Sequence, residues 1–213
     1  MGHGRVRLAV GLNSNIGHAA YAYYLSVMGR HNEAFVEVKK AQELEPLSLR
    51  VNSIVVGTLY RARQYDRAIE ECKKTIEMDP SFIRAHRQLG MNYEQKGMYP
   101  EAIAEFLTVQ ELTNGKAGAV AFGHAYAVAG KRSGAISIRD DLESRSTRTY
   151  VPPYWMATLY VGLGDKDRAF SWLERAYQER SGGLVWLRVD PRLDPLRQDP
   201  RFAALAQRIE LAS

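Results

Sequence analysis

The chain has 213 residues, of which 46% are hydrophobic and 25% are charged, a composition typical of soluble globular proteins. Its formal net charge of +5 favours acidic partners, but lysine and arginine are spread along the chain, which argues against a nucleic-acid-binding protein. The single cysteine, Cys72, excludes an internal disulfide and a cysteine-based metal site, and no apolar run approaches the ~20 residues that cross a membrane.

The first segment, residues 1–14, does not follow the pattern of the residues after it. Arg5 and Arg7 precede an apolar stretch, but that stretch is too short for a signal peptide and has no small-residue cleavage site. We therefore expect a cytoplasmic protein, and we assign no particular structure to residues 1–14.

From residue 15 onwards, one spacing rule repeats with a period near 34 residues. A small residue recurs at Ala34, Ala68, Ala102, Ala135 and Ala169. A second small or compact residue keeps the same step, at Ala22, Val56, Gly90, Gly123 and Ala157. Three residues after each comes a large one: Leu25, Leu59, Tyr93, Tyr126 and Tyr160. This period is typical of arrays of helix-turn-helix units, each of which buries its apolar face against its neighbours.

The spacing predicts five helix pairs, at about residues 15–48, 49–82, 83–115, 116–149 and 150–180. In the third pair, Leu89 and Tyr93 follow helical spacing, Gly97 stops the first helix and Pro100 opens the second. Glycine fits such a stop because a helix end commonly places one residue in the left-handed region. The same turn is predicted at Gly29, Gly130 and Gly164, and near Arg63 in the second pair.

Residues 181–213 form a tail that we expect to cap the array. Asp190, Asp194 and Asp199 each precede a proline, so each places a capping carboxylate before a residue suited to a first helical turn. The last of them begins a predicted final helix with apolar residues at helical spacing, which are Phe202, Leu205, Ile209 and Leu211. An end unit needs such a cap because no further repeat covers its outer face.

These residues resemble the tetratricopeptide repeat (TPR). The best-matching unit carries Leu89, Gly90, Tyr93, Gly97, Tyr99, Ala102 and Phe106. The resemblance covers about residues 15–180 and is weakest in the second unit, where Arg63 replaces the usual turn glycine. It implies an all-α fold, a right-handed superhelical solenoid of five TPR-like helix-turn-helix units with a C-terminal capping helix.

A narrower resemblance covers residues 150–202. Pro153-Tyr154-Trp155, Leu184-Val185-Trp186-Leu187 and Asp190-Pro191-Arg192 are similar to the C-terminal end of repeat regions in multidomain bacterial regulators. In such proteins the repeats usually follow a winged-helix, kinase or cyclase domain, and nothing in this sequence matches those domains. Two hypotheses follow: a protein-binding or peptide-binding scaffold, or the regulatory or sensory module of a bacterial signalling enzyme or DNA-binding regulator.

The sequence offers no candidate for catalysis. The histidines lie far apart and have no metal-ligand spacing: His3, His18, His31, His86 and His124. Glu70 and Glu71 lie on neighbouring faces of a solvated helix, and Cys72 has no paired histidine. We therefore expect no enzymatic activity, no catalytic residue, no cofactor and no metal.

The TPR resemblance implies a peptide-binding groove lined by the first helix of each pair. The corresponding residues are Tyr23, Arg50, Tyr60, Arg84, Arg87, Met91, Glu94, His124, Tyr154 and Thr158. Arginine offers bidentate contacts to carboxylates and tyrosine offers rigid contact area, so the expected partner is a protein or peptide, with a preference for acidic ones. The alternative is that Arg84 and Arg87 are only exposed helix-surface charges.

Two further expectations concern partners. The lysine and asparagine clamp with which some relatives bind chaperone tails is absent, because Ala19 and Tyr23 occupy the corresponding first-unit positions. Tyr21 and Tyr24 lie on the first helix, which no complete earlier repeat covers, so the ends of the array are candidate sites of self-association.

Overall fold

The computed structural model describes residues 14–211, and every regular element within that range is a helix. The predicted all-α class is therefore confirmed for this range. Residues 1–13, most of the segment to which we assigned no structure, lie outside it. The chain divides into two compact units, Met1–Lys96 and Gly97–Ser213. None of the described helices is long and apolar enough to cross a membrane.

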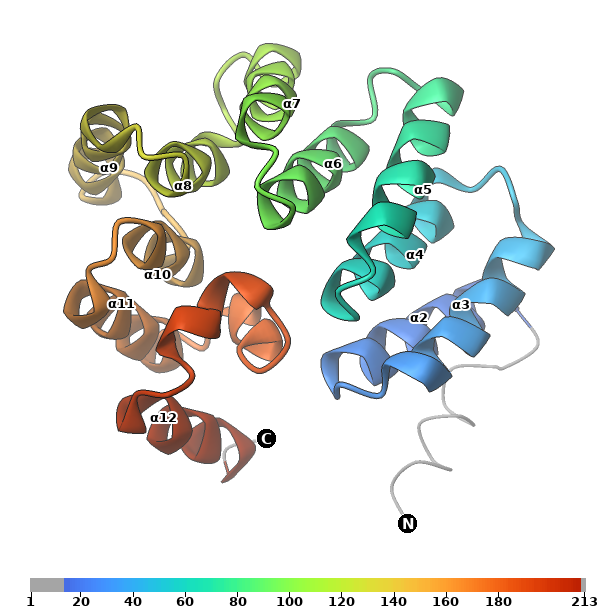
Figure 1. The fold of residues 1–213 in the computed structure, drawn as a ribbon. Coiled ribbons are helices and arrows are strands. Elements are labelled where there is room, and N and C mark those ends of the chain that lie inside the picture. The colour runs from blue at the N-terminus through green and yellow to red at the C-terminus, as the bar shows by residue number, and fades with distance from the viewer. Residues whose placement is uncertain (1–13, 212–213) are drawn as a thin grey trace. The chain divides into compact units, whose positions relative to one another are not determined.

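The first unit is built from helical hairpins. Helix α2 (Asn15–Val27) pairs with α3 (His31–Leu44), and α4 (Leu49–Arg61) pairs with α5 (Tyr65–Met78), as Figure 1 shows. Helix α6 (Ile83–Gln95) packs against α5 and α4. Because α4 also contacts α2, the helices α2, α4 and α6 form a continuous row, which we call the first-helix row.

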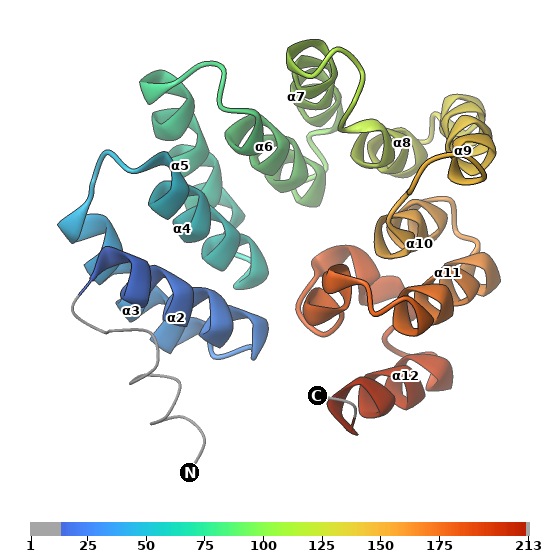
Figure 2. The same cartoon turned by 180° about the vertical axis from the view of Figure 1, so that it is seen from behind.

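The second unit repeats this hairpin pattern. Helix α7 (Tyr99–Leu112) packs against α8 (Ala119–Val128), which pairs with α9 (Arg132–Ser146). Helix α10 (Pro153–Gly162) pairs with α11 (Lys166–Gln178) and also contacts α8. Figure 2 shows the same helices from behind.

Turns between the helices place one residue in the left-handed region. The residues at this position, with φ between 61° and 78°, are Gly29, Arg63, Gly97, Gly130 and Gly164. Glycine takes this conformation freely, whereas a residue with a Cβ loses about 1–2 kcal/mol there. The turn predicted near Arg63 is therefore present, and it forms without the usual glycine.

Small residues lie where the helices approach most closely. Ala34, Ala68 and Ala169 are fully buried. At Gly123 in α8, an added Cβ would lie 3.0 Å from Ile138 Cγ2 and 3.1 Å from Leu159 Cδ1. The repeated small positions thus permit the close helix crossings that the spacing predicts.

The C-terminal segment folds back on the second unit. Two 3₁₀ helices, η1 (Gly182–Trp186) and η2 (Pro191–Leu196), pack on α10, and α12 (Pro200–Leu211) packs on α11. Leu184, Leu187 and Leu193 belong to the same hydrophobic core as the buried faces of α10 and α11.

Helix α12 is fastened to α11 by two similar arginine contacts. The Arg201 guanidinium donates from Nη1 to the Asp167 carboxylate at 2.8 Å and lies 4.2 Å from the Phe170 ring centroid. Two turns later, Arg208 donates to Glu174 at 2.7 and 2.9 Å and lies 4.3 Å from the ring centroid of an α11 tyrosine, Tyr177. Each contact combines an ion pair with a cation–π stack.

Candidate peptide-binding surface

Charge is distributed unequally between the helices of the first unit. The first-helix row carries four arginines and one glutamate. The partner helices α3 and α5 carry seven acidic and five basic residues. The row is therefore the positive side of this unit, although its composition is otherwise largely apolar.

Half of the predicted groove residues are accessible. Arg50 of α4 and Arg84 and Arg87 of α6 are exposed. Tyr23 of α2 is 37% exposed, and Met91 of α6 is half-buried. All of these residues lie on the first-helix row.

The other predicted groove residues are buried: Tyr60, Glu94, His124, Tyr154 and Thr158. The Tyr60 ring packs edge-on against Tyr65, with ring centroids 6.0 Å apart. His124 packs between helices, because an added Cβ on Gly162 of α10 would lie 2.8 Å from its Cδ2. These side chains contribute to the packing of their units.

Tyr154 is buried by the C-terminal segment. Its hydroxyl donates to Asp190 Oδ2 at 2.9 Å, and Gly183 lies so close that an added Cβ would be 2.6 Å from the Tyr154 ring. Asp190 also forms a buried ion pair with Arg192, whose guanidinium lies 5.1 Å from the Trp155 ring centroid. The face of α10 on which Tyr154 lies is thus covered by η1 and by Asp190.

The charge on Asp190 is held in place by these contacts. Burial favours the neutral carboxyl, but the Arg192 charge and hydrogen bonds from Arg192 and Tyr154 outweigh it and hold the pKa of Asp190 below its usual value. Asp190 is therefore ionised at neutral pH even though only 3% of it is exposed.

Two residues of the first-helix row were not anticipated from the sequence. Arg61 donates through Nε to Ser26 Oγ, and its guanidinium lies 5.6 Å from the Tyr23 ring centroid. It also lies beside Gly57, one turn earlier on α4. Gly57 occupies the repeat position that holds Tyr23 and Met91 in neighbouring units, but a glycine gives no side-chain signal.

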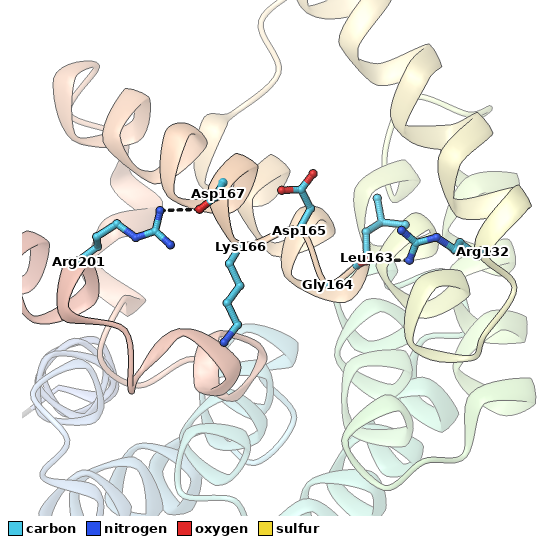
Figure 3. Close-up of a pocket in the computed structure, with 7 residues that line it drawn as sticks. All are labelled: Arg132, Leu163, Gly164, Asp165, Lys166, Asp167 and Arg201. Atoms are coloured by element: carbon cyan, nitrogen blue, oxygen red, sulfur yellow. Dashed lines mark hydrogen bonds and ion pairs between the residues drawn. The ribbon is translucent and has the colours of Figure 1, made fainter.

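The second unit contains a shallow pocket of about 550 Å³ at the start of α11. Its lining includes Lys166 and two arginines that are already engaged within the protein (Figure 3). Arg132 donates to the Leu163 carbonyl at 2.9 Å, and Arg201 to Asp167 at 2.8 Å. With two aspartates in the lining as well, the pocket presents both signs of charge and forms a weaker candidate than the first-helix row.

Solved structures with similar folds include two tetratricopeptide repeat proteins. A thermophilic TPR protein from Thermus thermophilus is 17% identical, with a TM-score of 0.64, over 84% of this chain and 99% of that one. A tetratricopeptide repeat protein from Parabacteroides merdae is 16% identical, with a TM-score of 0.62, over 92% and 78%. Pseudomonas aeruginosa pilF is 16% identical, with a TM-score of 0.54, over 100% and 94%.

These similarities establish the fold. The sequence itself matches no protein-family model and no curated protein. The chain is an all-α repeat solenoid of the TPR type, as the residue spacing and the TPR resemblance predict.

Proposed function

We propose that this TPR-type chain is a non-catalytic scaffold that binds a protein or peptide on its first-helix row. The observation that carries the proposal is the exposure of Arg50, Arg84 and Arg87 on the neighbouring helices α4 and α6, in the same row as the partly exposed Tyr23 of α2. Buried arginines would have indicated a packing role, whereas exposed ones are accessible to a ligand.

The ligand that fits this surface is an acidic peptide, extended or helical. Guanidinium groups pair with carboxylates in a bidentate geometry, and the Tyr23 ring and Met91 offer apolar contact area. The charges accelerate and orient the encounter, while the apolar contacts slow dissociation. The buried members of the predicted groove act by shaping the helices and make no direct contact with the ligand.

A peptide-library screen tests this function. The wild type should enrich acidic sequences, and the double variant Arg84→Ala/Arg87→Ala should bind them roughly tenfold more weakly, which is a change of about 1.4 kcal/mol. Raising the salt concentration should lower the association rate more than it raises the dissociation rate, because exposed charges are screened within ~8–10 Å.

A matched control removes the same charge elsewhere. Lys39 and Lys73 are exposed on α3 and α5, so Lys39→Ala/Lys73→Ala lowers the net charge equally without touching the first-helix row. This control should keep wild-type affinity. Enrichment of basic or purely apolar peptides, or equal losses in both double variants, would contradict the proposal.

A regulatory or sensory module of a bacterial signalling enzyme or DNA-binding regulator is the second candidate. It is favoured by the resemblance of Pro153-Tyr154-Trp155 and Asp190-Pro191-Arg192 to such proteins, since these residues form the buried contacts of the C-terminal segment. The native open reading frame decides the matter, because a winged-helix, kinase or cyclase domain in the same frame selects this candidate. For either candidate we propose a location in the bacterial cytoplasm.

Self-association is a further use of the first hairpin. The structure corrects one part of this expectation, because Tyr21 is only 5% exposed and packs in a core cluster with Leu25 and Ala34, with Tyr24 partly buried against it. The exposed apolar side chains of this hairpin are instead Ile16 of α2 and Val36 of α3, each more than half exposed. Light scattering across a concentration series tests this idea with the wild type and Val36→Glu. A monomer at all concentrations for both proteins would contradict it.

A further inference from the structure

The three helices of the first-helix row present equivalent repeat positions side by side. Ile16, Arg50 and Arg84 are each the second residue of their helix, in α2, α4 and α6. All three side chains are exposed, and that of Ile16 is 58% exposed. Because α4 packs against both α2 and α6, a peptide that crosses the row meets these three side chains in order.

A second set of equivalent positions lies further along the same helices. Tyr23, Gly57 and Met91 are each the ninth residue of their helix. Positions two and nine differ by about two helical turns, so both sets lie on one face of each helix. Helix α2 contains no Asp, Glu, Lys or Arg, and it places Ile16 and the partly exposed Tyr23 on this face. The face is therefore apolar on α2 and carries its positive charge on α4 and α6.

The guanidinium groups of Arg50 and Arg84 are accessible to a ligand. Both side chains are exposed, and within residues 14–211 neither guanidinium forms a hydrogen bond or an ion pair. The first turns of α4 and α6 contain no acidic residue that could compete for them. The separation of their backbone positions is that of two packed helices, about 8–10 Å.

This separation favours one backbone conformation of the ligand. In a polyproline II helix every third residue lies on the same side, and three residues advance the chain by about 9.3 Å. In a β-strand, residues three apart point to opposite faces, so they cannot contact one surface together. An α-helix would need residues seven apart, and the ~15 residues that span three contacts form only a marginally stable helix in water.

We propose that the ligand of this face is a polyproline II segment with an apolar residue at one position and acidic residues three and six positions away. The apolar residue packs against Ile16 and Tyr23, and the acidic residues pair with Arg50 and Arg84. The inference rests on the proposed function and gives its acidic ligand a backbone conformation and a residue spacing. Binding costs little backbone entropy, because a polyproline II segment is already extended before it binds.

The experiment measures the binding of two fluorescent peptides of equal composition to the full chain. In the first, Gly-Pro-Leu-Pro-Pro-Glu-Pro-Pro-Glu-Pro-Gly, leucine and the two glutamates follow one another at every third residue. In the second, Gly-Pro-Pro-Leu-Pro-Glu-Pro-Glu-Pro-Pro-Gly, they follow at every second residue. The wild type should bind the first peptide about tenfold more tightly, because the second cannot make all three contacts at once.

Variants of the chain assign each contact. Arg50→Ala should weaken binding of the first peptide about threefold, and should have no effect once the glutamate nearer the leucine is replaced by Gln. Ile16→Ser should also weaken binding, and should have no effect once the leucine is replaced by Ala. The matched controls are Lys39→Ala and Val36→Ser, at exposed positions of α3 outside the row. Both controls should keep wild-type affinity.

The outcomes separate this inference from the broader function. If the chain binds both peptides equally well and Ile16→Ser has no effect, the spacing is overturned and the proposed function stands. If replacing both glutamates by Gln leaves the affinity unchanged, both are overturned. If Ile16→Ser changes the molar mass in light scattering but not the affinity, the apolar end of this face binds a second copy and the inference is overturned. A preference for the first peptide that Arg50→Ala and Ile16→Ser reduce, and the controls do not, supports it.

Discussion

In both units, the first helix of each repeat occupies an equivalent position, but these helices have different surroundings in the two units. Helices α4 and α6 carry four arginines, three of them exposed, and border an accessible surface. Helices α8 and α10 contain no charged residue, and Tyr154 and Thr158 of α10 are fully buried. A repeat position therefore does not by itself decide whether a residue binds a ligand. What lies over the helix decides it.

The C-terminal segment makes the difference at α10. In the second unit it supplies Asp190 to the Tyr154 hydroxyl and Gly183 to the Tyr154 ring, so the chain covers this helix with its own residues. The absence of charged residues from α8 and α10 is consistent with that burial, since an unpaired charge in the interior is costly. In the first unit the arginines remain where a partner can reach them.

The largest test of this comparison is Asp190→Ala. It leaves the buried Arg192 charge without its carboxylate and the Tyr154 hydroxyl without its acceptor. We expect a loss of about 3–5 kcal/mol in the free energy of unfolding, measured by urea denaturation. Arg208→Ala, which breaks an exposed ion pair, is the control and should cost much less through that pair, because water screens the two charges. Equal losses would contradict the covered-face interpretation.

Gly183→Ala should have the next largest effect. Its methyl group would lie within 2.8 Å of three Tyr154 atoms, and the segment must move to admit it. Overpacking of this kind costs about 1–3 kcal/mol. The neighbouring Gly182→Ala is a matched control, because nothing lies within 4 Å of its added Cβ. Thermal denaturation of the two variants should differ by several degrees, and identical melting curves would show that the contact with Tyr154 is loose.

Acid should lower the free energy of unfolding through Asp190, which holds the C-terminal segment on α10. The pKa of Asp190 is held below its ordinary value of 3.8, so its contribution to stability is complete above that pH and is lost as the pH falls through the lowered pKa. The stability difference between the wild type and Asp190→Asn should be constant near neutral pH and shrink below about pH 4. A difference that stays unchanged at pH 2 would contradict this assignment.

The smallest expected effect is the change in the free energy of unfolding when the exposed arginines of α6 are removed. Arg84→Ala/Arg87→Ala should change the free energy of unfolding by no more than about 0.5 kcal/mol per site, because both side chains are exposed. Urea denaturation alongside the binding assay would separate the two roles. A large loss of stability would mean that these arginines hold the helices together.

The sequence predicts the scaffold better than the surface, for a physical reason. The turn glycines and the small residues such as Ala34 and Ala68 act within one repeat, so their spacing alone predicts the helix pairs. The burial of Tyr154 depends on the segment around Asp190, which is 36 residues away and which no repeat rule describes. Gly57 gave no signal because its role comes from the missing side chain, into whose space Arg61 extends.

The two arginine contacts between α11 and α12 impose a register on the last helix. Arg201 and Arg208 are seven residues apart, which is about two helical turns and ~10.5 Å of rise. Their partners on α11 keep the same separation, and they are Asp167, Phe170, Glu174 and Tyr177. A slip of α12 by a single turn would separate both guanidinium groups from both carboxylates and both rings at once. Helix α12 therefore has a single register on α11 in which both arginine contacts form, and a shifted register forms neither. Its docking should therefore be cooperative.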